Sequence, residues 1–177
     1  MPPGLSVLTN LRFLDLSDNA FGNVDLDFSG MTNLATLRVR DLPYSTTREA
    51  SITGLRNLTS LDFHCTDLLR LPANIGDLQC LQHLCISSCD LRELPPSITR
   101  CINLVCLDAG ENMFSVLPEN IGDLQALEYM DLYQSDFVTI PASICTLSRL
   151  KSLWLDSQNY PPGFDDFIAS TGCSHNE

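Results

Sequence analysis

The chain has 177 residues, of which 44% are hydrophobic and 18% are charged, a composition typical of one folded domain. Its 22 acidic and 10 basic residues give a formal net charge of −12, which argues against a nucleic-acid partner because such binding needs a basic surface. No apolar run reaches the roughly 18 residues that span a bilayer, so we expect no membrane insertion.

One pattern, L-x-x-L-x-L, recurs along most of the chain at intervals of 23 or 24 residues. Its seven opening leucines are Leu11, Leu34, Leu58, Leu81, Leu104, Leu127 and Leu150. We call the units repeats 1 to 7 and number positions from each opening leucine. Apolar residues at positions 4 and 6 alternate with more polar ones, which predicts a short strand with one buried face. One such strand cannot bury its face alone, so we predict that seven strands stack in parallel into one sheet.

A second apolar pattern lies between the strands. A Leu-Pro or Ile-Pro pair ends at Pro72, Pro95, Pro118 and Pro141, and an isoleucine follows three residues after each proline. An apolar residue comes three positions later again. This spacing behind a proline predicts a short helical turn on the other side of the stack, with proline at its first position.

The combined frame L-x-x-L-x-L-x-x-N-x-L-x-x-L-P-x-x-I-x-x-L resembles the leucine-rich-repeat family. The resemblance implies an α/β solenoid, a curved array of about seven turns with a parallel concave sheet and short helical or 3-10 turns on the convex side. It also implies protein binding on the concave face. The L-P-x-x-I version is similar to intracellular Ras-group repeats, which include Scribble/Erbin-like and plant proteins, and to the repeats of plant disease-resistance receptors.

Position 9 holds asparagine in the family frame, where its side chain bonds the backbone. Here it reads Asn19, Leu42, Thr66, Cys89, Asn112, Ser135 and Gln158. Thr, Ser and Cys are partial substitutes, whereas leucine forms no hydrogen bond. We therefore predict a weak ladder in repeat 2, whose return path at 43–48 is polar and irregular. That path is either a degenerate repeat or a bulged contact loop.

The two ends of the chain differ. Residues 1–10 follow the second half of a repeat, with Pro2, Leu5 and Leu8 in place, so we predict a partial first turn without a polar cap. This uncapped N-terminal turn is a possible contact with another surface. Residues 11–162 form the repeats and 163–177 a C-terminal cap and tail, all within a single domain. In the cap we expect a short amphipathic helix at 164–168 and a frayed end from Ser170.

Side chains at positions 3, 5 and 7 alternate with the buried leucines and so line the concave face. Arg38 and Arg40 lie there between Asp15 and Asp62. They form either a ladder of ion pairs, which contributes little when exposed, or a secondary partner-binding site.

The main candidate binding site lies nearer the C-terminus. Aromatic residues at concave positions are surrounded by acidic ones, as in a protein-binding hot spot that selects a basic partner. These candidate partner-binding residues are Asp108, Glu111, Tyr129, Asp131, Tyr133, Trp154 and Asp156. We predict a protein partner with a basic, partly apolar surface. The alternative is that the C-terminal cap folds over Trp154.

Histidine and cysteine also gather on the concave face, at His64, His83, Cys85 and Cys106. These residue types suit zinc, but neighbouring strands set them too far apart for one ion, so we expect no metal and no cofactor. Cys106 and His83 have no orienting third group, and the chain carries no catalytic motif. We therefore predict no catalytic residues and no enzyme activity.

The eight cysteines occupy ordinary repeat positions, such as Cys101 at a leucine position and Cys89 at the asparagine position. Free thiols of this kind favour a reducing compartment, so we expect a cytoplasmic protein. The sequence predicts a non-catalytic protein–protein interaction module or scaffold in intracellular signalling. Two alternatives remain open: a ligand-sensing repeat segment of a larger immune-type receptor, and a structural subunit of a large assembly.

Overall fold

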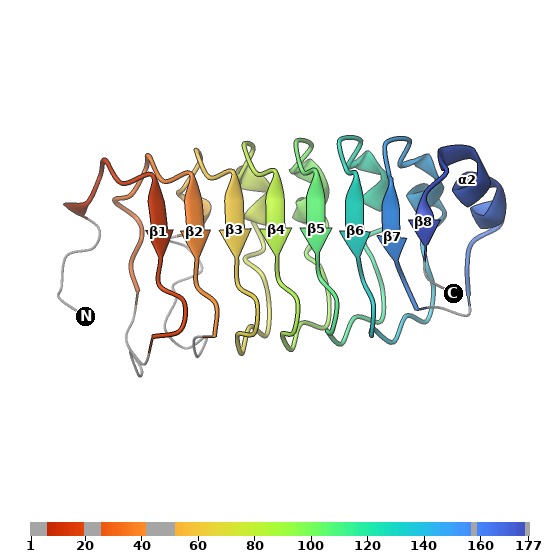
Figure 1. Ribbon diagram of the computed structural model, residues 1–177, viewed down its shortest axis with the longest axis horizontal. Helices are drawn as coiled ribbons and strands as arrows, with labels where there is room; N and C mark the ends of the chain where they lie inside the picture. Colours follow the sequence, from red (N-terminus) through yellow and green to blue (C-terminus); the bar gives the residue numbers. More distant parts are fainter. Residues whose placement is uncertain (1–6, 20–25, 42–51, 157–158, 176–177) are drawn as a thin grey trace.

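The computed structural model describes residues 7–19, 26–41, 52–156 and 159–175. The strands of these residues lie in one parallel sheet, in chain order from β1 to β8 (Figure 1). The strands are β1 (Phe13–Asp15), β2 (Thr36–Arg38), β3 (Ser60–Asp62), β4 (His83–Cys85), β5 (Cys106–Asp108), β6 (Tyr129–Asp131), β7 (Ser152–Trp154) and β8 (Ser174–His175). The solenoid predicted from the repeats is confirmed.

The register follows the leucine frame throughout. Leu37 pairs with Leu61 and Leu84 with Leu107, so the 24-residue spacing between repeats 2 and 3 does not shift the sheet. The side chains at positions 4 and 6 form one continuous core behind the strands. Because these side chains are buried, their neighbours at positions 3, 5 and 7 face the other side of the sheet.

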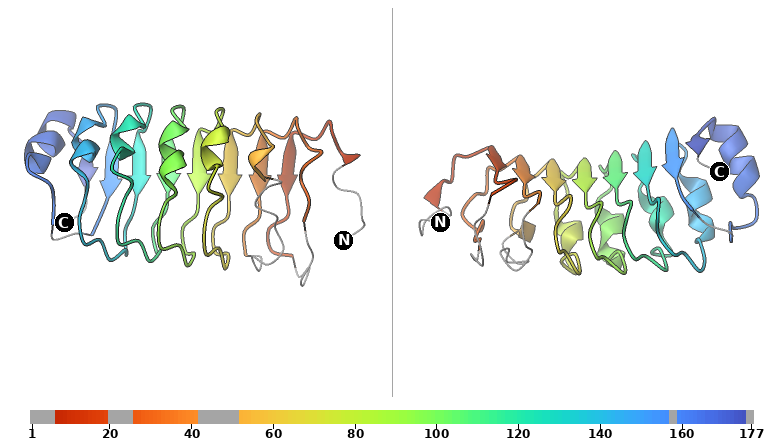
Figure 2. Two further views of the ribbon diagram at one scale, coloured as in Figure 1. Left: turned by 180° about the vertical axis from the view of Figure 1, so that it is seen from behind. Right: turned by 60° about the horizontal axis from the view of Figure 1, so that its bottom comes forward.

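In the described residues, four 3-10 helices line the opposite side of the stack, and the sheet lies on the inside of a gentle curve (Figure 2). They are η3 (Ile75–Asp77), η4 (Pro96–Arg100), η5 (Ile121–Asp123) and η6 (Ala142–Thr146). Our placement of the proline of the Leu-Pro or Ile-Pro pair at the first helical position is wrong, although the next residue, Pro96, begins η4. Pro95 and Pro141 instead precede the helix as N-caps, and their carbonyls accept from the amides of Ile98 and Ile144.

The 3-10 helices pack closely enough to require glycine at two of them. A Cβ on Gly76 of η3 would lie 2.1 Å from the carbonyl oxygen of Ser97 in η4. A Cβ on Gly122 of η5 would lie 2.2 Å from the carbonyl oxygen of Ser143 in η6. Each pair of helices is therefore in backbone contact.

The C-terminal segment repeats the architecture of a full repeat. The expected helix is present but longer, as α2 (Phe164–Thr171), which follows the η helices at the end of the stack (Figure 1). The ring of Tyr160 stacks on Phe164 with centroids 4.3 Å apart. The expectation of a frayed end from Ser170 is wrong for the described residues, since β8 continues the sheet by pairing with β7.

Position 9 behaves only in part as its residue types predict, because the buried hydroxyl of Ser135, an expected partial substitute, has no hydrogen-bond partner. Asn112 donates to the carbonyls of Ile86 and Ala109 at 2.9 Å each, which ties two repeats together. Thr66 and Cys89 are partial substitutes, and both donate to the carbonyl of Phe63. Leu42, Gln158 and the irregular path at 43–48 lie outside the described residues, as do Pro2 and Leu5.

A second set of asparagine hydrogen bonds lies at the residue before the opening leucine of repeats 2, 3 and 5. The side-chain amides of Asn33, Asn57 and Asn103 each donate to a carbonyl in the preceding repeat, at 2.8–2.9 Å. We did not predict this set, although the recurrence of Asn before Leu was visible in the sequence. These hydrogen bonds link neighbouring repeats along the edge of the sheet where the strands begin.

Candidate protein-binding surface

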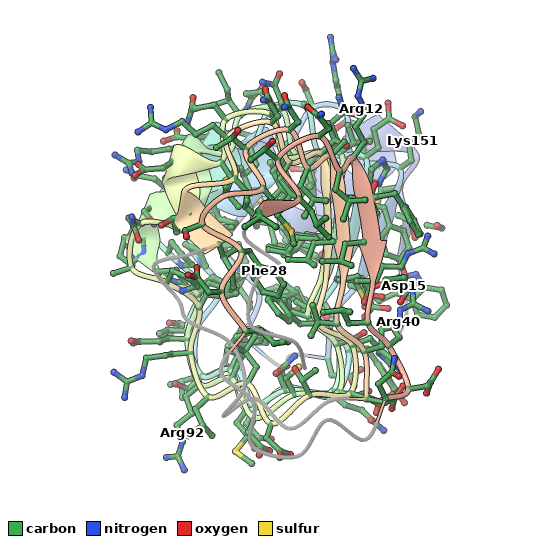
Figure 3. The ribbon with its side chains drawn as sticks, turned by 90° about the vertical axis from the view of Figure 1, so that its left-hand side faces the viewer. Arg12, Asp15, Phe28, Arg40, Arg92 and Lys151 are labelled. Atoms are coloured by element: carbon green, nitrogen blue, oxygen red, sulfur yellow. The ribbon has the colours of Figure 1, made fainter. Side chains whose placement is uncertain are left out.

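The outer face of the sheet is the candidate surface, because its side chains at positions 3, 5 and 7 point away from the core. Figure 3 shows Asp15 and Arg40 on this side of the sheet, with Phe28 on the opposite, inner side. Residues at one position in successive repeats lie next to one another, about 4.8 Å apart. The predicted neighbours His83 and Cys106 are thus paired in register, as are Asp108 and Asp131.

In the N-terminal half, both predicted arginines are bound to aspartates of the same chain. The Nε of Arg40 lies 2.6 Å from Oδ2 of Asp62, which is nearly buried. This hydrogen bond raises the pKa of the Arg40 guanidinium. Arg38 lies 3.7 Å from Asp15 and its guanidinium sits 5.5 Å from the centre of the Phe13 ring. These distances describe a ladder of ion pairs between strands.

In the C-terminal half, three aromatic side chains lie on the same face. Trp154 is 39% exposed and Tyr133 is 38% exposed, whereas Tyr129 is partly buried. The indole nitrogen of Trp154 donates to Oγ of Ser152 at 3.0 Å, which orients the ring. Because Trp154 is exposed, the alternative that the C-terminal cap buries this ring is wrong.

The four predicted carboxylates also bond to their own chain. Asp131 accepts from the backbone amide of Tyr133 at 2.9 Å and from the hydroxyl of Tyr129 at 3.1 Å. Burial, with the nearby Asp131 carboxylate, raises the pKa of the Tyr129 phenol. Asp156 accepts from the amide of Gln134 at 3.2 Å, and Asp108 lies 3.3 Å from the thiol of Cys85.

Glu111 differs from the other acids because it lies just past the strand. Its φ angle is 55°, in the left-handed region, and its carboxylate accepts from the hydroxyl of Ser88 at 3.0 Å. Six repeats place a non-glycine residue in this conformation at position 8, at Asp18, Asp41, Cys65, Ser88, Glu111 and Gln134. We did not predict this; the only signal was a run of polar or small residues at position 8.

None of these four carboxylates forms an ion pair with a lysine or arginine that the structure describes. Four acids and three aromatic rings thus share one open face. Such a surface offers hydrogen-bond acceptors and apolar area to a cationic partner, and backbone amides hold the carboxylates of Asp131 and Asp156 in place.

In the described part of the chain, the histidines and cysteines of this face meet only as a pair, where Nε2 of His64 lies 3.3 Å from Sγ of the neighbouring Cys65. Nδ1 of His64 lies 2.9 Å from Oγ of Ser87, and burial raises the pKa of the Cys106 thiol. Within the described ranges no three His, Cys, Asp or Glu side chains come close enough to hold a metal ion. The eight cysteines carry free thiols. The described residues of this face therefore offer no ligand cluster for a metal ion.

A family profile described as a leucine-rich repeat region matches residues 1–115. The chain belongs to the leucine-rich-repeat family. Domains of this family generally bind proteins or peptides and are typically non-catalytic. Comparison with curated proteins gives no significant match. In the part of the chain that the structure describes, no helix has the length and apolar character required to cross a membrane.

Solved structures share the fold. A leucine-rich-repeat protein of Leptospira interrogans is 22% identical, with a TM-score of 0.69 over 97% of this chain and 50% of its own. The PEPR1-AtPEP1 structure is 24% identical, with a TM-score of 0.83 over 98% of this chain and 25% of its own. The ectodomain of the Arabidopsis thaliana receptor kinase GASSHO1/SCHENGEN3 is 21% identical, with a TM-score of 0.68 over 95% and 21%. This chain therefore spans half or less of each neighbour's length.

Proposed function

We propose that this protein is a non-catalytic interaction module that binds a basic, partly apolar protein surface on the face of repeats 5 to 7. The observation that carries the proposal is the exposure of Trp154 and Tyr133 beside carboxylates that no described cation neutralises. Tryptophan and tyrosine are enriched in binding hot spots because they supply large contact area with few rotatable bonds. The acids add selectivity for a cationic partner and speed its association.

The rigidity of the surface supports the same function. Trp154 is oriented by Ser152, and Asp131 is held by two hydrogen bonds. A surface that is already ordered loses less conformational entropy when its partner binds.

The experiment compares wild type with a variant carrying Tyr129→Ala, Tyr133→Ala and Trp154→Ala. Affinity purification with mass spectrometry identifies partners, and calorimetry then measures binding of each purified partner. We expect binding to weaken at least tenfold in the variant, since each lost hot-spot residue costs about 2 kcal/mol.

The control is the double variant Arg38→Ala, Arg40→Ala, which alters the other end of the same face. Circular dichroism must show that both variants are folded. If the aromatic variant binds every partner as tightly as wild type, the proposed surface is wrong. If only the arginine variant loses binding, the secondary site is the interface.

More specifically, we propose that the protein is a cytoplasmic signalling scaffold of the Ras-group type. The L-P-x-x-I frame and the eight free thiols favour it, because thiols stay unpaired in a reducing compartment. Fractionation of cells that express the tagged protein tests the location. Recovery with a secretory or extracellular marker would contradict it.

A ligand-sensing segment of a larger immune-type receptor is a second candidate. It is favoured by the share of the two plant proteins that this chain spans, 21% and 25%. An antibody raised against the repeats distinguishes the two candidates by the mass of the native product. A band well above that of 177 residues supports the receptor segment.

The described part of the N-terminal turn supports the third candidate, a structural subunit that uses this turn as an interface. Val7 is 73% exposed and Leu8, next to it in the chain, is 45% exposed, while Phe13 on β1 is 52% exposed. Light scattering of wild type and Leu8→Glu tests this contact. A dimer that the substitution converts to a monomer supports the interface, and a monomer in both samples contradicts self-association.

A further inference from the structure

In repeats 1 and 2, an aromatic ring and an aspartate of one strand contact the guanidinium of an arginine on the next strand. Phe13 at position 3 and Asp15 at position 5 lie on β1, two residues apart on one face. Arg38 of β2 is paired in register with Asp15. Its guanidinium lies 3.7 Å from the Asp15 carboxylate and 5.5 Å from the centre of the Phe13 ring. An aromatic and an aspartate in this arrangement thus hold an arginine side chain.

The same two positions recur on β6 without the arginine. Tyr129 occupies position 3 and Asp131 position 5, and the residue paired in register with Asp131 on β7 is Trp154 instead of a cation. On the other side, Asp131 is paired with Asp108 of β5. Two carboxylates therefore stand side by side on neighbouring strands.

Aspartates at position 5 elsewhere on the sheet have a cation. Asp15 is paired with Arg38 and Asp62 with Arg40. Asp108 and Asp131 have none among the described residues. Like charges directly opposite each other on adjacent strands are unfavourable, and a cation supplied from outside relieves that repulsion.

We propose that Tyr129, Asp131 and Asp108 form a binding site for an arginine side chain on an extended segment of the protein partner. This inference rests on the proposed function and names the chemical group that the surface selects. The segment that binds the face of β5 to β7 carries an arginine, because its positive charge complements the two unpaired carboxylates.

Arginine fits this site better than lysine for geometric reasons. The planar guanidinium carries five donors, so it can bond two carboxylates while its face stacks on an aromatic ring. Asp131 keeps acceptor capacity because each of its oxygens takes only one bond from its own chain. Trp154 next to it adds a second ring against which the aliphatic part of the arginine packs.

The test uses three short peptides of glycine and serine that carry two arginines, two lysines or two citrullines. Trp154 is the only tryptophan of the chain, so its fluorescence reports binding at this site directly. We expect a saturable change with the arginine peptide, an affinity for the lysine peptide lower by about threefold or more, and no binding of uncharged citrulline.

The variants Asp108→Asn and Asp131→Asn remove one charge each with little change in shape. Each is expected to weaken binding of the arginine peptide roughly tenfold, since hydrogen bonds to charged groups are the stronger ones. The matched control is Asp123→Asn on η5, which removes the same charge from the convex side and is expected to bind like wild type.

Three results would overturn the arginine site: equal affinity for arginine and lysine, equal loss in the Asp123 control, or no saturable signal at millimolar peptide. Purified partners from the previous experiment separate this failure from failure of the proposed function. A partner that needs Tyr133 and Trp154 but tolerates Asp108→Asn and Asp131→Asn leaves the interaction surface standing and removes the arginine site. If a partner binds all four of these variants as tightly as wild type, both the interaction surface and the arginine site are wrong.

Discussion

At position 9 of each repeat, one side chain has to satisfy backbone groups of two repeats. Asn112 does so fully, because its amide donates to Ile86 and Ala109 while its oxygen accepts from the amide of Leu91. Ser135 occupies the same position one repeat later and is also buried. Its hydroxyl has no hydrogen-bond partner, since a serine is too short to reach the preceding repeat.

The substitution Ser135→Asn is therefore expected to stabilise the protein by about 1 kcal/mol or more, because it supplies hydrogen bonds to buried groups. Urea unfolding of wild type and variant measures the difference. Ser135→Ala is the control and is expected to change stability little, as it removes a hydroxyl that bonds nothing. A less stable asparagine variant would mean that the site lacks room for the longer side chain.

Two cysteines on opposite faces of the core couple stability to pH. Burial raises the pKa of the Cys85 thiol from the usual 9.0 to about 12 and that of Cys101 to about 11. In the unfolded chain both thiols lose their proton near pH 9, whereas in the folded chain they keep it. Above that pH the folded state binds more protons, so the free energy of unfolding falls as the pH rises.

We expect the urea midpoint to be constant between pH 7 and 8 and to fall between pH 9 and about 11. The double variant Cys85→Ser, Cys101→Ala is expected to show a smaller fall over the same interval, whatever its stability at neutral pH. An identical fall in both proteins would assign the effect to other groups, such as Tyr129.

At the scale of elements, contact between 3-10 helices depends on two glycines. The amide of Gly76 in η3 faces Oγ of Ser97 in η4, and Gly122 of η5 faces Ser143 of η6 in the same way. Gln79 and Gln125 reinforce each pair by donating to the carbonyls of Arg100 and Thr146. Repeats 3 to 6 thus carry two matched pairs of 3-10 helices on the convex side.

The substitutions Gly76→Ala and Gly122→Ala should each destabilise the protein by about 2 kcal/mol, because the new methyl group would overlap a carbonyl oxygen of the next helix. Thermal unfolding measures the loss. Gly163→Ala is the control, because nothing lies within 4 Å of a Cβ there. Its only expected cost is the backbone strain of an alanine at a φ of 82°. Equal losses at all three glycines would contradict the packing explanation.

The whole molecule is a stack in which each repeat is covered mainly by its neighbours. Leu84 of repeat 4 lies between two repeats and is 1% exposed. Leu14, at the same position in repeat 1, is only partly buried. The contribution of one leucine therefore depends on its place along the stack.

We expect Leu84→Ala to cost about 3 kcal/mol and Leu14→Ala about half as much, since the cost follows the burial of the deleted atoms. Urea unfolding of both variants at one protein concentration measures the difference. An equal cost at the two positions would mean that further surface covers repeat 1 in solution, as the self-association candidate requires.

Much of the candidate binding surface could be predicted from the sequence. The positions of Tyr133 and Trp154 on the open face follow from two-residue alternation, and the pairing of Asp108 with Asp131 follows from repeat length. The bonds that hold Asp131 and Asp156 were not predictable, because they depend on how the backbone leaves each strand. The sequence also did not determine with which aspartate each arginine forms its ion pair.

The sequence by itself determined the sheet, its register and the core, because a repeated apolar pattern can be buried in only one way by parallel stacking. It also indicated the helix at the C-terminus. Only the tertiary structure decided the left-handed position 8, the second set of asparagine hydrogen bonds and β8, since each depends on contacts between repeats. The contrast between paired and unpaired aspartates belongs to the same group: charges that lie two dozen residues apart in the chain meet only when the solenoid forms.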